Sequence, residues 1–142
     1  METRELVDVI IVAILGFMSI VSFAIVLNRY FFIKNVNITN YNSLDEIENA
    51  LTSYMHLLAS IGSNAPYIGL LGTVIGIMAT FSSISMDNTN VSAIMQGLSS
   101  ALFATGLGLL VAIPSVFFYN ILLRGVKNKI VKWKVKYGRE RV

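Results

Sequence analysis

Hydroxyl side chains are the residues of this chain that could do chemistry inside its apolar part. Those that we single out within two long apolar segments are Thr73, Thr80, Ser100 and Thr105. A hydroxyl donates and accepts hydrogen bonds, so it can solvate a passing proton or cation without titrating itself. The only formal charge between Glu48 and Arg124 is Asp87. This pattern predicts a polar lining for an ion path, but not a proton relay that works alone, because such a relay places ionisable groups inside the membrane.

Other kinds of active site are not indicated. The chain has no cysteine and a single histidine, His56, which excludes thiolate sites and histidine-rich metal sites. It has no evident nucleophile–base pair, and its glycine-rich stretch lacks the lysine of a phosphate-binding loop. We therefore predict that the protein is not an enzyme and that it holds no metal or other cofactor, with protons as the ion that could be transported.

The composition places most of the chain in a membrane. Apolar residues make up 55% and charged residues 13% of the sequence, whereas charged residues run near a quarter in soluble domains. Apolar segments at about 9–27, 66–86 and 92–123 are long enough to cross a hydrocarbon core of roughly 30 Å as helices. The fold class predicted is all-α, with a single membrane domain over residues 1–142, three transmembrane helices, and long second and third helices that extend into the cytoplasm.

Two prolines mark changes of helix geometry. Pro66 follows the capping candidates Ser63 and Asn64, so we expect the second transmembrane helix to start there. Pro114 lies inside the third transmembrane segment and predicts a kink, because proline removes one backbone hydrogen bond from the helix.

Flanking charges predict the orientation. Eight of the 11 lysines and arginines lie within residues 124–141, and Arg29 and Lys34 follow the first segment, whereas the link 82–92 has no basic residue. The positive-inside rule then places the N-terminus outside and the C-terminus in the cytoplasm. A basic tail could bind nucleic acid, but after an apolar span the 124–142 tail is better suited to anionic lipid headgroups.

A third kind of segment lies between the first two spans, at about 43–61. Ser43 and Glu46 form a capping box. Apolar residues then recur at helical spacing at Leu44, Ile47, Leu51, Met55 and Leu58, and Gly62 supplies a stop. This predicts an amphipathic cytoplasmic helix that packs against the other helices, because its acidic polar face would be repelled by anionic lipid.

Small residues form one stripe on each of the last two spans. The glycines of these stripes are Gly69, Gly72 and Gly76 in the second span and Gly97 and Gly108 in the third. Small residues let helix backbones approach closely in a membrane. The stripes are therefore either packing surfaces, with threonine hydroxyls bonded back to their own helices, or the lining of a lumen. Asp87 could collect cations at the outer mouth, or it could be an ordinary loop acid or helix cap.

The last two spans also carry motifs that resemble a known family. The segments NAPYIGLLGTVIGIMATF at 64–81 and GLSSALFATGLGLLVAIPSVFFYN at 97–120 resemble ExbB and TolQ proteins, most closely ExbB, and more distantly MotA-type stators. The resemblance covers these spans closely and the rest of the chain mainly in layout. It implies a subunit of a proton-driven motor complex in the bacterial inner membrane, with a periplasmic N-terminus.

The resemblance also implies partners and residue roles. ExbB-like proteins form pentamers around two copies of an ExbD- or TolR-like single-span partner, whose aspartate carries the proton, and they energise TonB and outer-membrane transport. Thr73 and Thr105 match the threonines that face the lumen in that family. One departure is Ser100, which stands where ExbB and TolQ proteins usually carry a glutamate. Two other functions remain open: TolQ-like maintenance of the cell envelope, and a structural scaffold of packed helices without ion passage.

Overall fold

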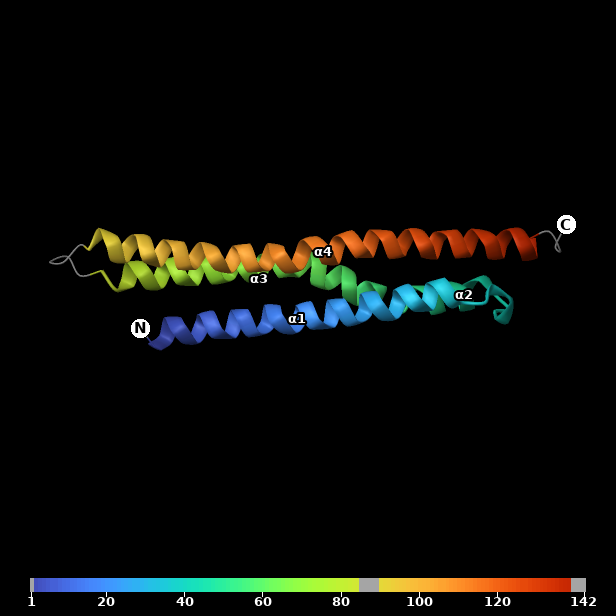
Figure 1. The fold of residues 1–142 in the computed structure, drawn as a ribbon, viewed down its shortest axis with the longest axis horizontal. Coiled ribbons are helices and arrows are strands. Elements are labelled where there is room, and N and C mark those ends of the chain that lie inside the picture. The colour runs from blue at the N-terminus through green and yellow to red at the C-terminus, as the bar shows by residue number, and fades with distance from the viewer. Residues whose placement is uncertain (1, 85–89, 139–142) are drawn as a thin grey trace.

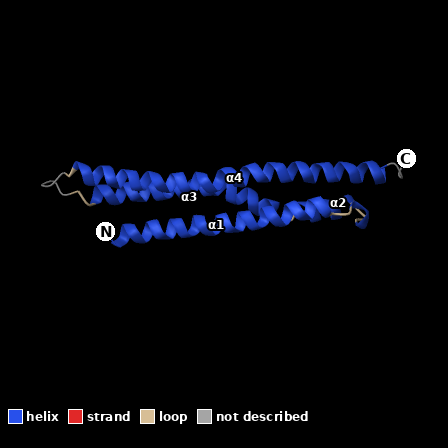
Figure 2. Ribbon diagram, viewed as in Figure 1, coloured by secondary structure: helices blue, strands red, loops and turns tan. Residues whose placement is uncertain are grey.

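The computed structural model describes residues 2–84 and 90–138. Within these residues the chain consists of helices and loops, with no strand (Figure 2). The helices are α1 (Glu2–Asn35), the short 3-10 helix η1 (Ile38–Asn40), α2 (Leu44–Thr52), α3 (Met55–Ser82) and α4 (Val91–Gly138). Three of them, α1, α3 and α4, are long and apolar enough to cross a membrane. The predicted all-α fold with three spanning helices is confirmed.

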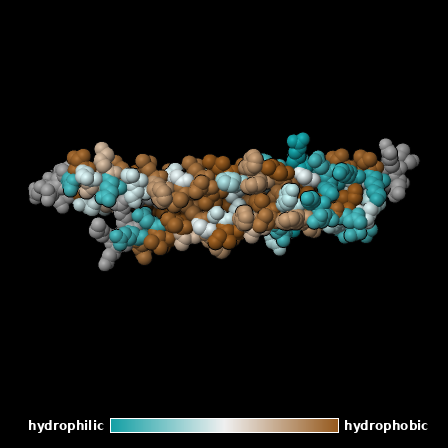
Figure 3. All heavy atoms as spheres, viewed as in Figure 1, coloured by the Kyte–Doolittle hydropathy of each residue, from teal (hydrophilic) through white to brown (hydrophobic). Residues whose placement is uncertain are grey.

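The long helices lie side by side in an elongated bundle (Figure 1). The start of α1, the end of α3 and the start of α4 lie at one end, the N-terminal end, while α2 and the end of α4 lie at the other, the C-terminal end. Figure 3 shows hydrophobic residues over the middle of the bundle and hydrophilic residues gathered at the C-terminal end. This distribution suits a membrane-embedded middle with polar ends.

The closest helix contact is the α3–α4 seam, which is formed by Gly69, Gly72 and Gly76 of α3 with Ala101, Ala104 and Gly108 of α4. A Cβ atom on Gly69 would lie 2.7 Å from the carbonyl oxygen of Ala104, and one on Gly108 would lie 2.6 Å from that of Ala65. No side chain fits at either position. The two small-residue stripes therefore face each other within one chain, as the packing interpretation predicts.

Helix α1 packs across this pair. Ile11 and Leu15 join Ala65, Ala104 and Ala112 in a buried cluster where α1, α3 and α4 meet. Nearer the C-terminal end, the hydroxyls of Ser22 and Ser115 are hydrogen-bonded at 2.7 Å. Because Ser115 donates to the carbonyl of Val111 at 2.8 Å, the donor in the α1–α4 bond is Ser22.

A buried arginine fixes the corner between α2 and α3. Arg29 is 7% exposed, and its guanidinium donates to the carbonyl of Ala50 at 3.1 Å, in the last turn of α2, where helix carbonyls lack partners. The same guanidinium lies 4.5 Å from the ring centroid of Phe32 and 5.5 Å from that of Tyr54. Cation–π contacts and a helix C-terminus thus stabilise a buried positive charge.

The expected cytoplasmic helix at about 43–61 is divided in two, which corrects the prediction of one continuous helix. Helix α2 ends at Thr52, and α3 begins at Met55 after Tyr54, whose φ of 62° is left-handed. Contacts with Arg29 hold this turn. The predicted apolar face is nevertheless buried, because Ile47, Leu51 and Leu58 pack against α1 and α4 rather than facing a membrane surface.

The prediction that a helix starts at Pro66 is also wrong, because α3 runs through Gly62 and Pro66 without a break. Gly62 lies against α4, where an added Cβ would meet the side chain of Val116 at 2.7 Å. The presumed caps do not cap: Asn64 donates within the helix to the carbonyl of Ser60 at 2.8 Å, as does Ser63 at 3.1 Å. Figure 1 shows α3 bending in its green part, from α4 towards α1.

The other boundaries differ less. Helix α3 ends at Ser82 rather than near residue 86. At this end the hydroxyls of Ser82 and Ser83 donate to the carbonyls of Ala79 and Thr80. Helix α4 continues through Pro114 and on to Gly138, so the described part of the basic tail is helical. Trp133 in this extension donates to the carbonyl of Tyr41 at 3.2 Å.

We expect Gly108→Ala to destabilise the bundle by about 2 kcal/mol, because the new methyl group would overlap the carbonyl of Ala65 and overpack the seam. Thermal unfolding in mild detergent measures the effect. Gly106→Ala is the matched control, since nothing lies within 4 Å of a Cβ there. Equal melting temperatures for the two variants would contradict the close approach of α3 and α4.

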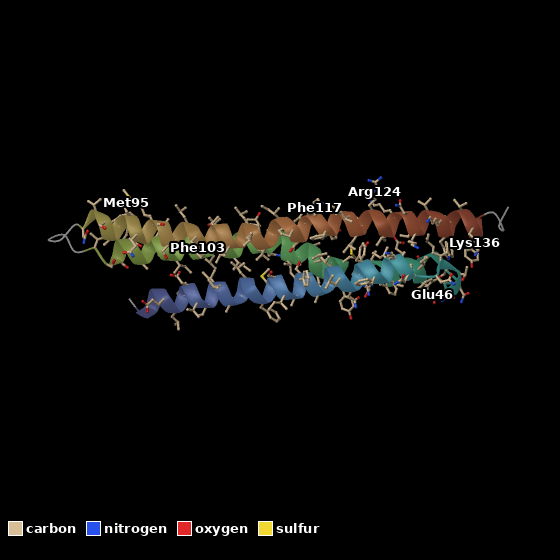
Figure 4. All side chains as sticks on the ribbon, in the orientation of Figure 1. Glu46, Met95, Phe103, Phe117, Arg124 and Lys136 are labelled. Carbon is tan, nitrogen blue, oxygen red and sulfur yellow. The ribbon has the colours of Figure 1, made fainter. Side chains whose placement is uncertain are left out.

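Replacing Arg29 tests the corner. Arg29→Met should lower the free energy of unfolding by about 2 kcal/mol, because it removes a charged hydrogen bond to Ala50, and should speed amide exchange in α2. Arg124→Met is the control, because Arg124 is exposed and points away from the bundle (Figure 4). A larger loss of unfolding free energy for the Arg124 variant than for the Arg29 variant would contradict the stabilising role of Arg29 between α2 and α3.

Candidate functional site

The predicted site threonines meet across the α3–α4 seam. The hydroxyls of Thr73 and Thr105 are in direct hydrogen-bond contact. Thr73 also lies within hydrogen-bond distance of two carbonyls, Ala101 at 3.0 Å and Gly69 at 3.3 Å. Thr105 lies 3.4 Å from the carbonyl of Gly69. Residues from two helices thus form one compact group of hydroxyls and carbonyl oxygens, which we call the threonine pair.

The glycine pattern positions this pair. Gly69 lies four residues before Thr73 on α3, and Ala101 four residues before Thr105 on α4, so each small residue is on the same helix face as its threonine. Close backbone approach at these small residues brings their carbonyl oxygens within reach of the hydroxyls. Thr73 is 8% exposed and Thr105 is half-buried, so Thr105 carries the accessible side of the pair.

The threonine hydroxyls were predicted either to bond back to their own helices or to line a lumen. Thr73 bonds back to its own helix at Gly69, as the packing interpretation expects, but it also bonds across to α4 at Ala101. Within one chain the threonine pair is a helix-to-helix contact. Its role as the lining of a lumen between several chains stays a prediction.

Two other predicted lining residues, Thr80 and Ser100, border a recess of about 720 Å³ at the N-terminal end. We call it the N-terminal recess. Thr80 is buried, packs against Gly97 and donates to the carbonyl of Gly76 at 2.8 Å. Ser100 is exposed. Thr80 lies about two helical turns from Thr73, so the recess and the threonine pair follow each other along α3.

The recess also contains two acids that the sequence analysis did not select, Glu5 and Asp8 of α1. Their three-residue spacing puts them on one helix face, and the predicted topology puts the N-terminus at the same end as the α3–α4 connection. Those two facts together could have identified them. The sequence candidate at this end, Asp87, lies outside the described residues.

Within the described residues, the hydrogen-bond partners of the threonine pair are hydroxyl and carbonyl oxygens, with no titratable side chain among them. Glu5 and Asp8 lie in the first turns of α1, and basic residues of α4 begin at Arg124. In the described part of the chain, no three His, Cys, Asp or Glu side chains are grouped so that they could hold a metal ion. Chemically, the hydroxyl oxygens of the threonine pair can accept a hydrogen bond from a hydronium ion or a carboxyl group. A hydroxyl that turns from its carbonyl partner can instead donate to a carboxylate, and neither hydroxyl can retain a charge itself.

Comparisons with known proteins agree with the motifs. A profile described as the MotA/TolQ/ExbB proton channel family matches residues 34–135. The chain is 44% identical over 138 residues to "Biopolymer transport protein ExbB" of Aquifex aeolicus, covering 96% of this chain and 93% of that protein. It is also 44% identical to "Putative biopolymer transport protein ExbB-like 2" of Helicobacter pylori, covering 93% and 89%, and 43% identical to the ExbB of Helicobacter pylori, covering 85% and 84%.

A cysteine pair tests whether the two threonines stay together in the membrane. Thr73→Cys/Thr105→Cys should form a disulfide within one chain under mild oxidation, because the hydroxyls they replace are in contact and disulfides need closely spaced Cβ atoms. The chain has no other cysteine, so gel mobility after oxidation is unambiguous. Thr73→Cys with Gly106→Cys is the control and should stay reduced, because Gly106 contacts nothing across the seam. Crosslinks between chains in place of the internal disulfide would contradict the arrangement.

Proposed function

Because the chain belongs to the MotA/TolQ/ExbB proton channel family, we propose that it is the channel subunit of an inner-membrane motor complex that energises TonB-dependent transport through the outer membrane. Membership of the family makes it a multi-pass membrane transport protein and not an enzyme. The relatives named above as ExbB biopolymer transport proteins match most of the chain, which supports an ExbB role over a TolQ role.

The observation that carries this proposal is the threonine pair. Its hydroxyls lie at the middle of the α3–α4 seam, where α3 has no charged residue and those of α4 begin only at Arg124. A charge near the bilayer centre costs roughly 2.5–3.5 kcal/mol on insertion scales. Two hydroxyls reduce that cost for a carboxylate that passes them, without competing for its proton.

The proton carrier then belongs to a partner. We propose a pentamer of this chain around two copies of an ExbD- or TolR-like single-span protein, with a TonB-like protein receiving the motion. The partner's membrane aspartate would be solvated by Thr73 and Thr105 as it moves. One elementary charge crossing 100 mV releases about 2.3 kcal/mol, so a few protons suffice to drive a conformational step.

The remaining polar groups fit this path. With the N-terminal end in the periplasm, Glu5 and Asp8 in the N-terminal recess would attract cations to the entrance, and Asp87 could add to them. The lysine-rich extension of α4 would lie in the cytoplasm, in accord with the positive-inside rule. Ser100 borders the recess rather than the threonine pair, so the path proposed here needs no carboxylate at that position.

We expect Thr73→Val and Thr105→Val each to abolish TonB-dependent uptake while the complex still assembles, because valine keeps the shape and removes the hydroxyl. Thr73→Ser should retain uptake, because it keeps the oxygen. Thr52→Val is the control, since Thr52 bonds back to Glu48 in α2, away from the seam. Uptake of an iron chelate and native mass of the complex are the measurements. Full uptake in both valine variants would exclude the lining role.

Deletion and stoichiometry separate the alternatives. Iron starvation after deletion supports the ExbB role, whereas detergent sensitivity and outer-membrane blebbing would assign the chain to envelope maintenance. A native mass of five chains with two single-span partners supports the motor. A stable monomer or dimer in mild detergent would instead favour the scaffold without ion passage.

A further inference from the structure

A second cavity lies between α1 and α4. It is an open groove of about 440 Å³, bordered by Ser19, Phe23 and Tyr30 of α1 and by Pro114, Phe118 and Ile121 of α4. At its base, Ser22 and Ser115 are bonded to each other, so no polar group there needs an outside partner. We call it the α1–α4 groove. We propose that it binds one acyl chain of an anionic phospholipid, with the headgroup at Lys34 and Lys129.

The length of the groove suits an extended hydrocarbon chain. From Ser19 to Tyr30 it runs about 17 Å along α1. A single hydrocarbon chain is slender enough to lie within it. The walls are apolar, and most of the groove lies beside the apolar run 9–27 of α1, at the depth of lipid tails.

The charges at one end of the groove select the headgroup. The Lys34 ammonium lies 6.0 Å from the ring centroid of Tyr30, which borders the groove. On the other wall, Lys129 follows Phe118 by 11 residues, close to three helical turns, so it repeats the position of Phe118 on the same face of α4.

The two helices are in register at this end. They run parallel, with Ser22 bonded to Ser115 and Ile33 in contact with the position of Gly125. That offset puts Lys34 and Lys129 at adjacent levels just beyond the groove. Arg124 cannot serve, because it points away from the bundle (Figure 4). Two ammonium groups at one end of an apolar groove complement an anionic phosphate at the end of an acyl chain.

The proposal needs only a folded chain in a membrane, so it stands apart from ion transport. The test is native mass spectrometry of the complex purified in mild detergent, titrated with phosphatidylglycerol or with phosphatidylcholine. We expect one phosphatidylglycerol bound per chain, with tighter binding than phosphatidylcholine. Lys34→Gln/Lys129→Gln should weaken phosphatidylglycerol binding about 25-fold, at roughly five-fold per lysine, and leave phosphatidylcholine binding unchanged.

Two further variants make the test specific. Lys127→Gln removes an equal charge about 200° around α4 from Lys129 and should change nothing. Ser19→Phe, at an exposed position on the groove wall, should weaken the binding of both lipids because the ring fills the groove. Native mass shows whether the complex is intact. Equal phosphatidylglycerol affinity for the wild type and the double-lysine variant would overturn the proposal. So would photocrosslinking of Ser19→p-benzoylphenylalanine to a neighbouring protein chain in intact membranes, because it would place protein in the groove.

Discussion

The structure depends on the close approach of two helix backbones along the α3–α4 seam. Inside a bilayer, burying apolar side chains gives no advantage over lipid, so helices associate through tight packing and interhelical hydrogen bonds. Gly69 and Gly108 supply the packing, since each meets main-chain atoms of the other helix where a side chain would stand. The hydrogen bonds of Thr73 to α4 follow from that proximity. The candidate site is thus a product of the same contact that holds the bundle together.

The two ends of the bundle are built differently, and each suits its surroundings. The N-terminal end has a polar recess with acidic residues from α1. The C-terminal end has a conventional apolar core in which α2 is enclosed by α1 and α4. Arg29 donates to the carbonyl of Ala50 in α2, and Trp133 donates to the carbonyl of Tyr41 in the preceding loop. Outside the hydrocarbon region the hydrophobic effect operates again, so larger side chains such as Leu51 and Leu58 replace glycine and alanine as the packing units.

Much of this could be read from the sequence, because apolar length predicts spans and small-residue spacing predicts which faces meet. The predictions that failed depend on distant contacts. Whether Pro66 starts a helix or lies within one depends on Gly62 packing against Val116, and the break at Tyr54 depends on Arg29, which is far away in the sequence. Glu5 and Asp8 join Ser100 only once α1 is placed beside α4. The hydroxyl chemistry of Thr73 and Thr105 was predictable from the sequence. Whether these hydroxyls meet between helices of one chain or face a lumen was left open.

The prolines of α3 and α4 have a mechanical consequence. Each removes one hydrogen bond from its helix ladder, between residues 62 and 66 in α3 and between 110 and 114 in α4. Because Gly62 lies against Ser115, these two missing bonds fall at nearly one level of the bundle, where Ser22 also ties α1 to α4. The bundle is therefore most compliant in a single transverse plane. Bending of the bundle is therefore expected at that level, with the helix segments on either side moving as rigid bodies about it.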